Sequence, residues 1–223
     1  MYGLQFAVVA STASITVLSL ILAISLTLNF RMKRQASYLF WSLGMWIFAL
    51  GVALELVFAF GVYNKLLADA YLFAVALTVE LLALGSMQLI RSAKARLAYY
   101  AYCIATSVLL AVLLYTSKFG NIIVTYVVFG ALPLPVVIAS SLIAFPAAVL
   151  LAVIAAMSYR RTRSSKMLSI IAGVVVVSVA GTLYIAAFPE FLYFAEFAGI
   201  LLLWLGFFEI KTFREALRSY SKF

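Results

Sequence analysis

The residues in this sequence that are best suited to chemistry are carboxyl groups placed in long apolar segments. The chain has only seven acids among its 223 residues. A charged side chain at the centre of a bilayer costs at least about 2.5 to 3.5 kcal/mol, so an acid kept there usually faces a partner or water. Five acids lie within or at the ends of apolar segments, and we predict that they bind a ligand or a proton: Glu55, Glu80, Glu196, Asp69 and Glu190.

Three of these acids, Glu55, Glu80 and Glu196, lie inside apolar segments that contain no lysine or arginine. Each must therefore be protonated, hydrated or bound to a cation, since no buried ion-pair partner is available. The alternative is a structural role, in which a protonated glutamate hydrogen-bonds a neighbouring helix. Candidate partners for that role occur in the first apolar segment: Ser11, Thr12, Ser14 and Thr16.

The spacing of the acids predicts how they are placed. Gly44, Gly51 and Glu55 recur at helical intervals, so Glu55 shares a face with glycines that allow a second helix to approach closely. Asp69 and Glu80 are separated by about three turns, or roughly 16 Å along one helical face. We expect these two acids to line one wall of an outward-opening cavity, to which the preceding helix contributes Glu55.

Other residue types that support catalysis or metal binding are scarce. The chain has no histidine, which removes the usual ligand of haem and copper and the commonest general base near neutral pH. Its single cysteine, Cys103, lies in an apolar segment and excludes a disulfide framework or a thiolate cluster. Because no serine-centred or metal-binding motif is recognisable either, we expect no enzyme, no metal site and no cofactor.

The elements that position the acids are predicted to be transmembrane helices. Apolar residues make up 67% of the chain and charged residues 10%, and the mean hydropathy is +1.19, which excludes an ordinary soluble domain. A helix needs about 20 apolar residues to cross the hydrocarbon core. We predict an all-α polytopic membrane protein of the cell membrane, with a transmembrane domain over 1–210 that has seven spans: 4–29, 38–63, 66–90, 97–117, 136–159, 167–188 and 191–210.

The basic residues predict the orientation of these spans. Fourteen of the 16 lysines and arginines follow the first, third, fifth and seventh spans, whereas the other connections hold only Lys65 and Lys118. By the positive-inside rule, the N-terminus lies outside and the C-terminus in the cytoplasm. Topology thus accounts for the net charge of +9, and we expect no nucleic-acid partner. The first span should not be a cleavable signal, because no basic residue precedes it.

Residues 121–135 do not fit the simple succession of spans. They are apolar almost throughout, but an eighth span here would place the basic residues that follow the fifth span outside. We therefore predict an outer-face segment. An interfacial strand pair, a re-entrant piece and an outward extension of the fifth helix are all compatible with its composition.

Two other local features have a physical consequence. Pro146 lies inside the fifth span, where it should free a carbonyl one turn earlier and kink the helix. Residues 211–223 alternate basic and apolar side chains, which predicts a cytoplasmic tail held along the inner leaflet by anionic lipids. A docking tail for a cytoplasmic partner is the alternative.

An internal repeat is predicted from the match between residues 69–89 and 190–210. A shift of 121 residues aligns Asp69 with Glu190 and the Leu-Gly pair 84–85 with the Leu-Gly pair 205–206. Two unrelated but similar membrane helices are the alternative. A repeat would make spans one to three and five to seven parallel copies joined by the fourth, a 3+1+3 arrangement.

In topology alone, this arrangement is similar to the microbial rhodopsins and to the SWEET sugar carriers. Retinal binding in the rhodopsin family requires a lysine within the seventh helix, whereas Lys211 lies at the cytoplasmic end of that span. No Pro-Gln dipeptide of the SWEET type occurs in the chain. The similarity therefore extends to topology and not to a functional motif.

Together, these features favour a small membrane transporter or channel-like protein that uses embedded carboxyls to bind a small solute, a cation or a proton. Two alternatives are a non-enzymatic sensor or receptor-like module and an accessory subunit of a membrane complex. The glycine faces could pack within the chain or between chains, so a homo-oligomer or a membrane-complex partner is compatible with the sequence.

Overall fold

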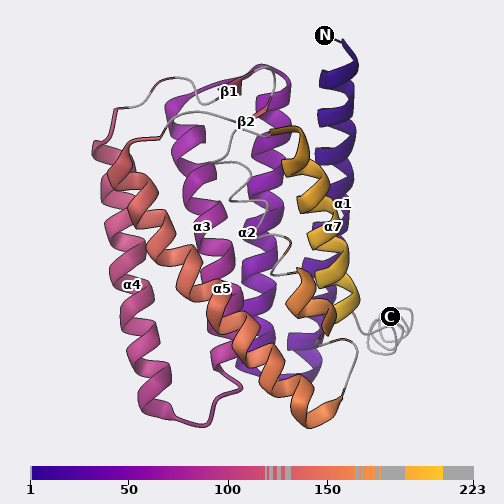
Figure 1. Cartoon of the computed structure of the whole chain (residues 1–223), viewed down its shortest axis with the longest axis vertical. Coiled ribbons are helices and arrows are strands. Elements are labelled where there is room, and N and C mark those ends of the chain that lie inside the picture. Colours follow the sequence, from indigo (N-terminus) through magenta and orange to yellow (C-terminus); the bar gives the residue numbers. More distant parts are fainter. Residues whose placement is uncertain are drawn as a thin grey trace.

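The computed structural model describes residues 2–118, 120, 123–124, 127–128, 132–163, 166, 168–173, 176 and 189–207. Over these residues the chain is almost entirely helical (Figure 1). The helices are α1 (Tyr2–Lys33), α2 (Ala36–Ala59), α3 (Lys65–Met87), α4 (Ala93–Thr116), α5 (Leu134–Thr162) and α7 (Pro189–Phe207), and the strands β1 (Ile123–Val124) and β2 (Val127–Val128) lie between α4 and α5.

Five of these helices, α1 to α5, are long and apolar enough to cross a membrane. Many apolar side chains point away from the bundle, among them Val108 and Val112 of α4. Such side chains suit hydrocarbon, in which a helix also satisfies its own backbone hydrogen bonds. The chain is therefore a multi-pass helical membrane protein.

The five helices overlap the first five predicted spans. Helix α7 overlaps the seventh and contains a shorter apolar stretch, Phe197–Gly206. The sixth predicted span, 167–188, lies mostly outside the described residues, although 168–173 are helical. The predicted tail, 211–223, also lies outside them. The seven-span count and the repeat therefore stay predictions.

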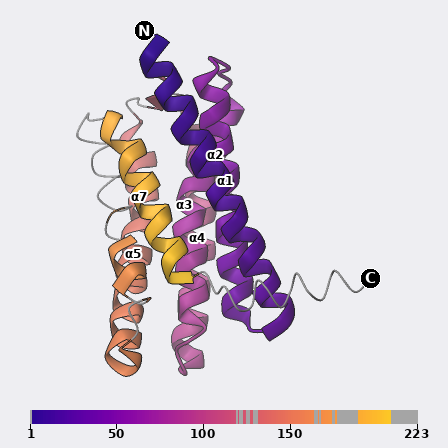
Figure 2. The ribbon, with the colours of Figure 1, turned by 90° about the vertical axis from the view of Figure 1, so that its right-hand side faces the viewer.

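Helix α3 lies at the centre of the described bundle. It packs against α2, α4 and α5, while α1 packs against α2 and α7 (Figures 1 and 2). The largest apolar cluster joins Leu22 of α1, Met45 of α2, Leu82 of α3, Leu151 of α5 and Leu203 of α7. The two acids nearest the middle of the predicted spans are thus carried by neighbouring helices at the core.

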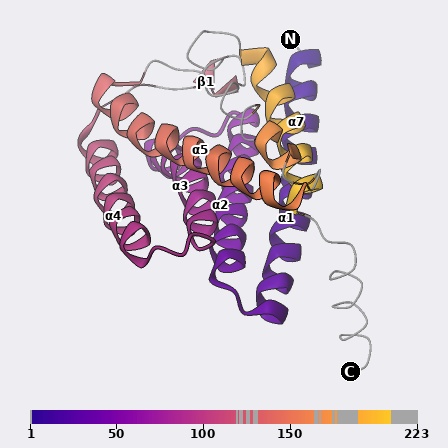
Figure 3. The same ribbon diagram turned by 60° about the horizontal axis from the view of Figure 1, so that its bottom comes forward.

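The two ends of the bundle differ in chemistry (Figures 1 and 3). The strands and the connection between α2 and α3 lie at the end where α1 begins, which we call the strand end. The opposite end, which we call the basic end, carries the connections 34–35 and 88–92 and the last turn of α5. Its basic residues are Arg31, Lys33, Arg34, Arg91, Lys94, Arg96, Arg160, Arg161 and Arg163.

Close packing between α2 and α3 depends on glycine, as the sequence predicts for Gly44. A Cβ atom added to Gly44 would lie 3.3 Å from side-chain atoms of Leu81 and Leu82. On α3, a Cβ at Gly85 would clash with Cδ1 of Trp41. The Trp41 indole N–H is then able to donate to the carbonyl oxygen of Leu82 at 3.2 Å. The glycines fix how α2 is rotated against α3.

Pro146 leaves one carbonyl oxygen of α5 without its helical hydrogen bond, and a side chain of α4 donates a hydrogen bond to that oxygen. Proline has no N–H, so the carbonyl of Leu142, four residues earlier, has no partner from position 146. The Tyr102 hydroxyl donates to that carbonyl oxygen at 2.5 Å. This contact joins α4 to α5 at the proline, in the way that membrane helices tolerate an internal proline.

The strands occupy part of the segment 121–135. They pair antiparallel, with Ile123 opposite Val128 and Val124 opposite Val127, and β2 contacts α2. A strand pair is one of the three conformations that the sequence leaves open for this segment. Its other residues up to 131 lie outside those described.

Candidate functional site

Glu55 of α2 is buried between α2 and α3 and has one hydrogen-bond donor among the described residues. The side chain is 2% exposed, and the Tyr71 hydroxyl of α3 donates to its Oε1 at 2.5 Å. The Phe58 ring stands edge-on to the Tyr71 ring, with 5.8 Å between the centroids. Oε2 of Glu55 has no hydrogen-bond partner among the described residues. A buried carboxyl oxygen without a partner is costly, so this site has capacity for a proton or a ligand.

Glu80 of α3 is equally buried but has two donors, both from α4. The side chain is 2% exposed. The Ser107 hydroxyl donates to Oε2 at 2.6 Å, and the Thr106 hydroxyl lies 3.3 Å from Oε1. Cys103 and Tyr102 of α4 are close enough to Glu80 to interact with it electrostatically. The carboxyl is therefore surrounded by the polar side of α4.

Glu55 and Glu80 lie on opposite sides of α3. Tyr71, which contacts Glu55, and Glu80 are nine positions apart, which is about half a turn around the axis and roughly 13 Å along it. One side of α3 faces α2 and the other faces α4. Glu55 therefore lies on the other side of α3 from Glu80, whereas the sequence predicts that the preceding helix contributes Glu55 to a cavity lined by Asp69 and Glu80.

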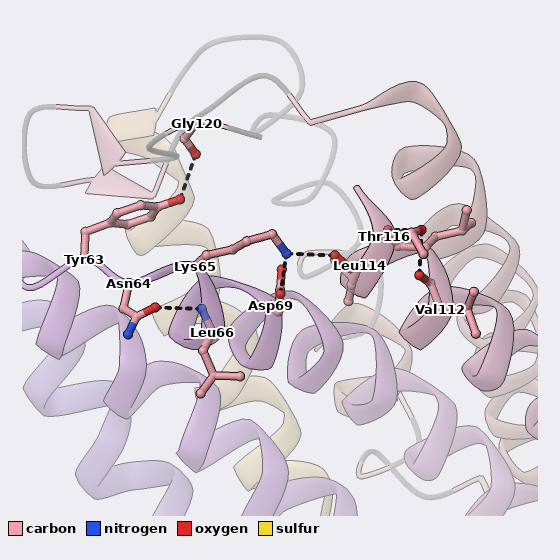
Figure 4. Close-up of polar contacts among 10 residues, drawn as sticks. Tyr63, Asn64, Lys65, Leu66, Asp69, Val112, Leu114, Thr116 and Gly120 are labelled. Carbon is pink, nitrogen blue, oxygen red and sulfur yellow. Dashed lines mark hydrogen bonds and ion pairs between the residues drawn. The ribbon is translucent and has the colours of Figure 1, made fainter. Parts of the chain in front are cut away.

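Asp69 lies on the same side of α3 as Glu80, as their spacing predicts. One of its oxygens is in a salt bridge, whereas its buried Oδ1 has no hydrogen-bond partner among the described residues. Its Oδ2 lies 2.7 Å from Nζ of Lys65, which also donates to the carbonyl oxygen of Leu114 in α4 at 2.9 Å (Figure 4). Tyr63 donates to the carbonyl oxygen of Gly120 nearby. These contacts make Asp69 part of the packing at the strand end.

Glu190 and Glu196 are in α7, but their side chains lie outside the part of the chain that the structure describes in detail. Whether they face Glu55 or Glu80 therefore stays a prediction.

The hydroxyl groups of α1 do not supply the partners of the two buried glutamates. The hydroxyls of Thr12, Ser14 and Thr16 donate to carbonyl oxygens of their own helix at 2.7 to 3.2 Å. Tyr71, Thr106 and Ser107 take that role instead. The sequence interpretation missed them, although Thr106 and Ser107 form an adjacent hydroxyl pair in the middle of a predicted span, which is a signal that could have been used.

A further polar residue that the sequence interpretation missed is Asn29 of α1. It is 1% exposed, and neither its amide nitrogen nor its amide oxygen has a hydrogen-bond partner among the described residues. Buried amides are nearly always paired. Asn29 is therefore another buried residue in the bundle whose hydrogen-bonding groups are unused by the described residues.

Within the described residues, no three histidine, cysteine, aspartate or glutamate side chains come together as a metal site would require. No known protein family matches the chain, and no similar curated protein or solved structure was found. The fold and the site thus define a multi-pass helical membrane protein whose central helix has a buried carboxyl on each side, Glu55 of α2 and its own Glu80.

Proposed function

We propose that this protein is a small membrane transporter or channel-like protein that moves a proton, a small cation or a small solute. The observation that carries the proposal is the Glu55–Tyr71 pair, a buried carboxyl with one donor and one oxygen that has no partner in the described chain. A proton or a cation supplies what that oxygen lacks. Ionisable groups inside membrane spans commonly belong to such ion pathways.

The hydrogen bonds around Glu80 give second support. The Thr106 hydroxyl has one hydrogen, and its shorter contact is to the carbonyl oxygen of Tyr102 at 2.9 Å rather than to Glu80 at 3.3 Å. Thr106 is thus a weaker donor to Oε1 than Ser107 is to Oε2. Glu80 is a second buried carboxyl inside the predicted spans, where ionisable groups commonly belong to ion pathways.

The arrangement of charge supports the topology on which the proposal depends. The described connections after α1, α3 and α5 place their basic residues at the basic end, while Lys65 and Lys118 belong to the strand end. An outside N-terminus, seven spans, a 3+1+3 repeat that pairs Asp69 with Glu190, and a location in the cell membrane remain parts of the proposal. So does the binding of anionic lipid by residues 211–223.

Ion flux into liposomes tests the proposal. Purified protein is reconstituted with a pH-sensitive dye inside, and a potassium gradient with valinomycin sets the membrane potential. Wild type should acidify the lumen, and Glu55→Gln should lower the initial rate by about tenfold or more because the site loses its exchangeable proton. Tyr71→Phe should lower it less, because only the donor to Oε1 is removed.

Two matched variants control this experiment. Asp69→Asn removes an acid that is already in a salt bridge, and Tyr99→Phe removes the hydroxyl of a buried tyrosine in α4. Both should keep the wild-type rate to within about twofold, since neither group touches Glu55. Uptake of radioactive sodium or potassium ions tests whether the protein moves a cation instead of a proton. If no ion flux responds to Glu55→Gln, or Asp69→Asn is equally damaging, the proposal fails.

An accessory subunit without transport activity is the second candidate, and the satisfied carboxyl of Glu80 favours it. Both oxygens of Glu80 are bonded by α4, which is what a purely structural acid needs. A Glu80→Gln variant separates the two roles. Unchanged flux with a lower melting temperature assigns Glu80 to structure, whereas lost flux at an unchanged melting temperature assigns it to transport.

A further inference from the structure

A groove opens at the basic end, between the end of α3 and the last turns of α5. Its volume is about 490 Å³, which is within the usual range of ligand pockets. One side is formed by Leu89, Ile90 and Arg91, which follow α3. The other side is formed by α5: Ile154, Met157, Ser158 and Arg161.

The α5 side of the groove is one continuous helical face. Positions 154, 157, 158 and 161 follow the spacing i, i+3, i+4, i+7, so their side chains lie on one face of the helix. The row begins with the buried Ile154 and ends with Arg161 in the last turn. The groove is therefore apolar toward the middle of the bundle and cationic toward its basic end.

The described lining residues of the groove carry charge of one sign. Arg91 and Arg161 come from different elements, and the described lining residues contribute no acid. Neither arginine forms an ion pair with a described residue. Two guanidinium groups that line the same groove suit a phosphate, because each can donate two parallel hydrogen bonds to its oxygens.

The apolar part of the groove distinguishes a lipid from a soluble anion. Leu89 is 52% exposed and Met157 is 49% exposed, so both present apolar surface beside the arginines. A free phosphate would make no favourable contact with these apolar side chains, whereas the acyl chains of a phospholipid would cover them. Basic pockets between membrane helices are typical sites for anionic lipid headgroups.

We propose that this groove binds one anionic phospholipid, with its phosphate between Arg91 and Arg161 and its acyl chains along Leu89, Ile154 and Met157. The site is independent of the transport proposal and of residues 211–223. It would hold α3 and α5 together at the basic end.

Native mass spectrometry of the whole chain tests this inference. The protein is purified with equal amounts of phosphatidylglycerol and phosphatidylcholine, and the lipids that remain bound are compared. Wild type should retain phosphatidylglycerol in at least about fivefold excess, as expected for a charge-selective site. R91Q/R161Q should reduce this ratio toward one, and R91K/R161K should keep part of it because the charges persist.

The matched control is K94Q/R160Q, which removes the same charge from neighbouring positions of the basic end that do not line the groove. This variant should keep the wild-type ratio, and equal losses in both double variants would overturn the site in favour of a diffuse charge effect. Inorganic phosphate should not displace the bound lipid, and displacement at millimolar concentration would assign the groove to a soluble anion instead. The lipid ratio of R91Q/R161Q is measured only on monodisperse protein. If this variant still retains phosphatidylglycerol in excess, the proposal is also overturned.

Discussion

At the residue scale, the two buried glutamates differ in how fully their oxygens are used. Glu55 has one donor, Tyr71, and an oxygen with no described partner, whereas Glu80 has a donor for each oxygen. Unused hydrogen-bonding capacity costs free energy unless something else fills it. Binding is therefore expected at Glu55, and a contribution to stability is expected at Glu80.

Removal of one hydroxyl tests the contribution of Glu80 to stability. Ser107→Ala should lower the free energy of unfolding by about 1 kcal/mol, because the mutation leaves Oε2 of Glu80 buried without its 2.6 Å donor. The control is Ser140→Ala, since the Ser140 hydroxyl donates only to Val137 of its own helix. Both are measured by denaturation in mixed micelles. An equal effect of the two mutations would mean that the interhelical hydrogen bond adds no more stability than a hydrogen bond within one helix.

At the element scale, the irregular point of α5 is stabilised by a neighbouring helix. Pro146 cannot supply an N–H to the Leu142 carbonyl, and Tyr102 of α4 supplies a hydroxyl instead. The sequence predicts the freed carbonyl from the proline alone. It does not predict which residue donates to that carbonyl. Tyr102 is 40 positions from Leu142 and reaches α5 only after both helices have packed.

A double-mutant cycle between Tyr102 and Pro146 measures this coupling. Tyr102→Phe should cost about 1 kcal/mol of unfolding free energy in the wild-type background, where the carbonyl loses its donor. In a Pro146→Ala background, the restored backbone N–H can satisfy Leu142, so the same Tyr102→Phe change should cost much less. The free energies are compared in the same micelles. Additive effects would show that the two residues are not coupled.

At the scale of the whole molecule, hydropathy and charge predict much of the architecture, while the partners of the site depend on packing. The five helices that are long and apolar enough to cross a membrane follow from apolar length. The close contact at Gly44 follows from residue size and spacing. Tyr71 and Ser107, however, are 16 and 27 residues from the acids they contact, and only the rotation of α2 and α4 about α3 brings them together.

Cysteine accessibility in intact cells tests the orientation and the number of spans together. The native Cys103 is buried, so wild type provides the background signal for an impermeant maleimide. Asn64→Cys at the strand end should react in intact cells, whereas Lys94→Cys at the basic end should react only after permeabilisation. Ser219→Cys should behave like Lys94→Cys, because seven spans place the tail on the inner side. If Ser219→Cys reacts in intact cells while Lys94→Cys does not, an odd number of spans separates the two positions instead of the predicted four, and the seven-span prediction is wrong.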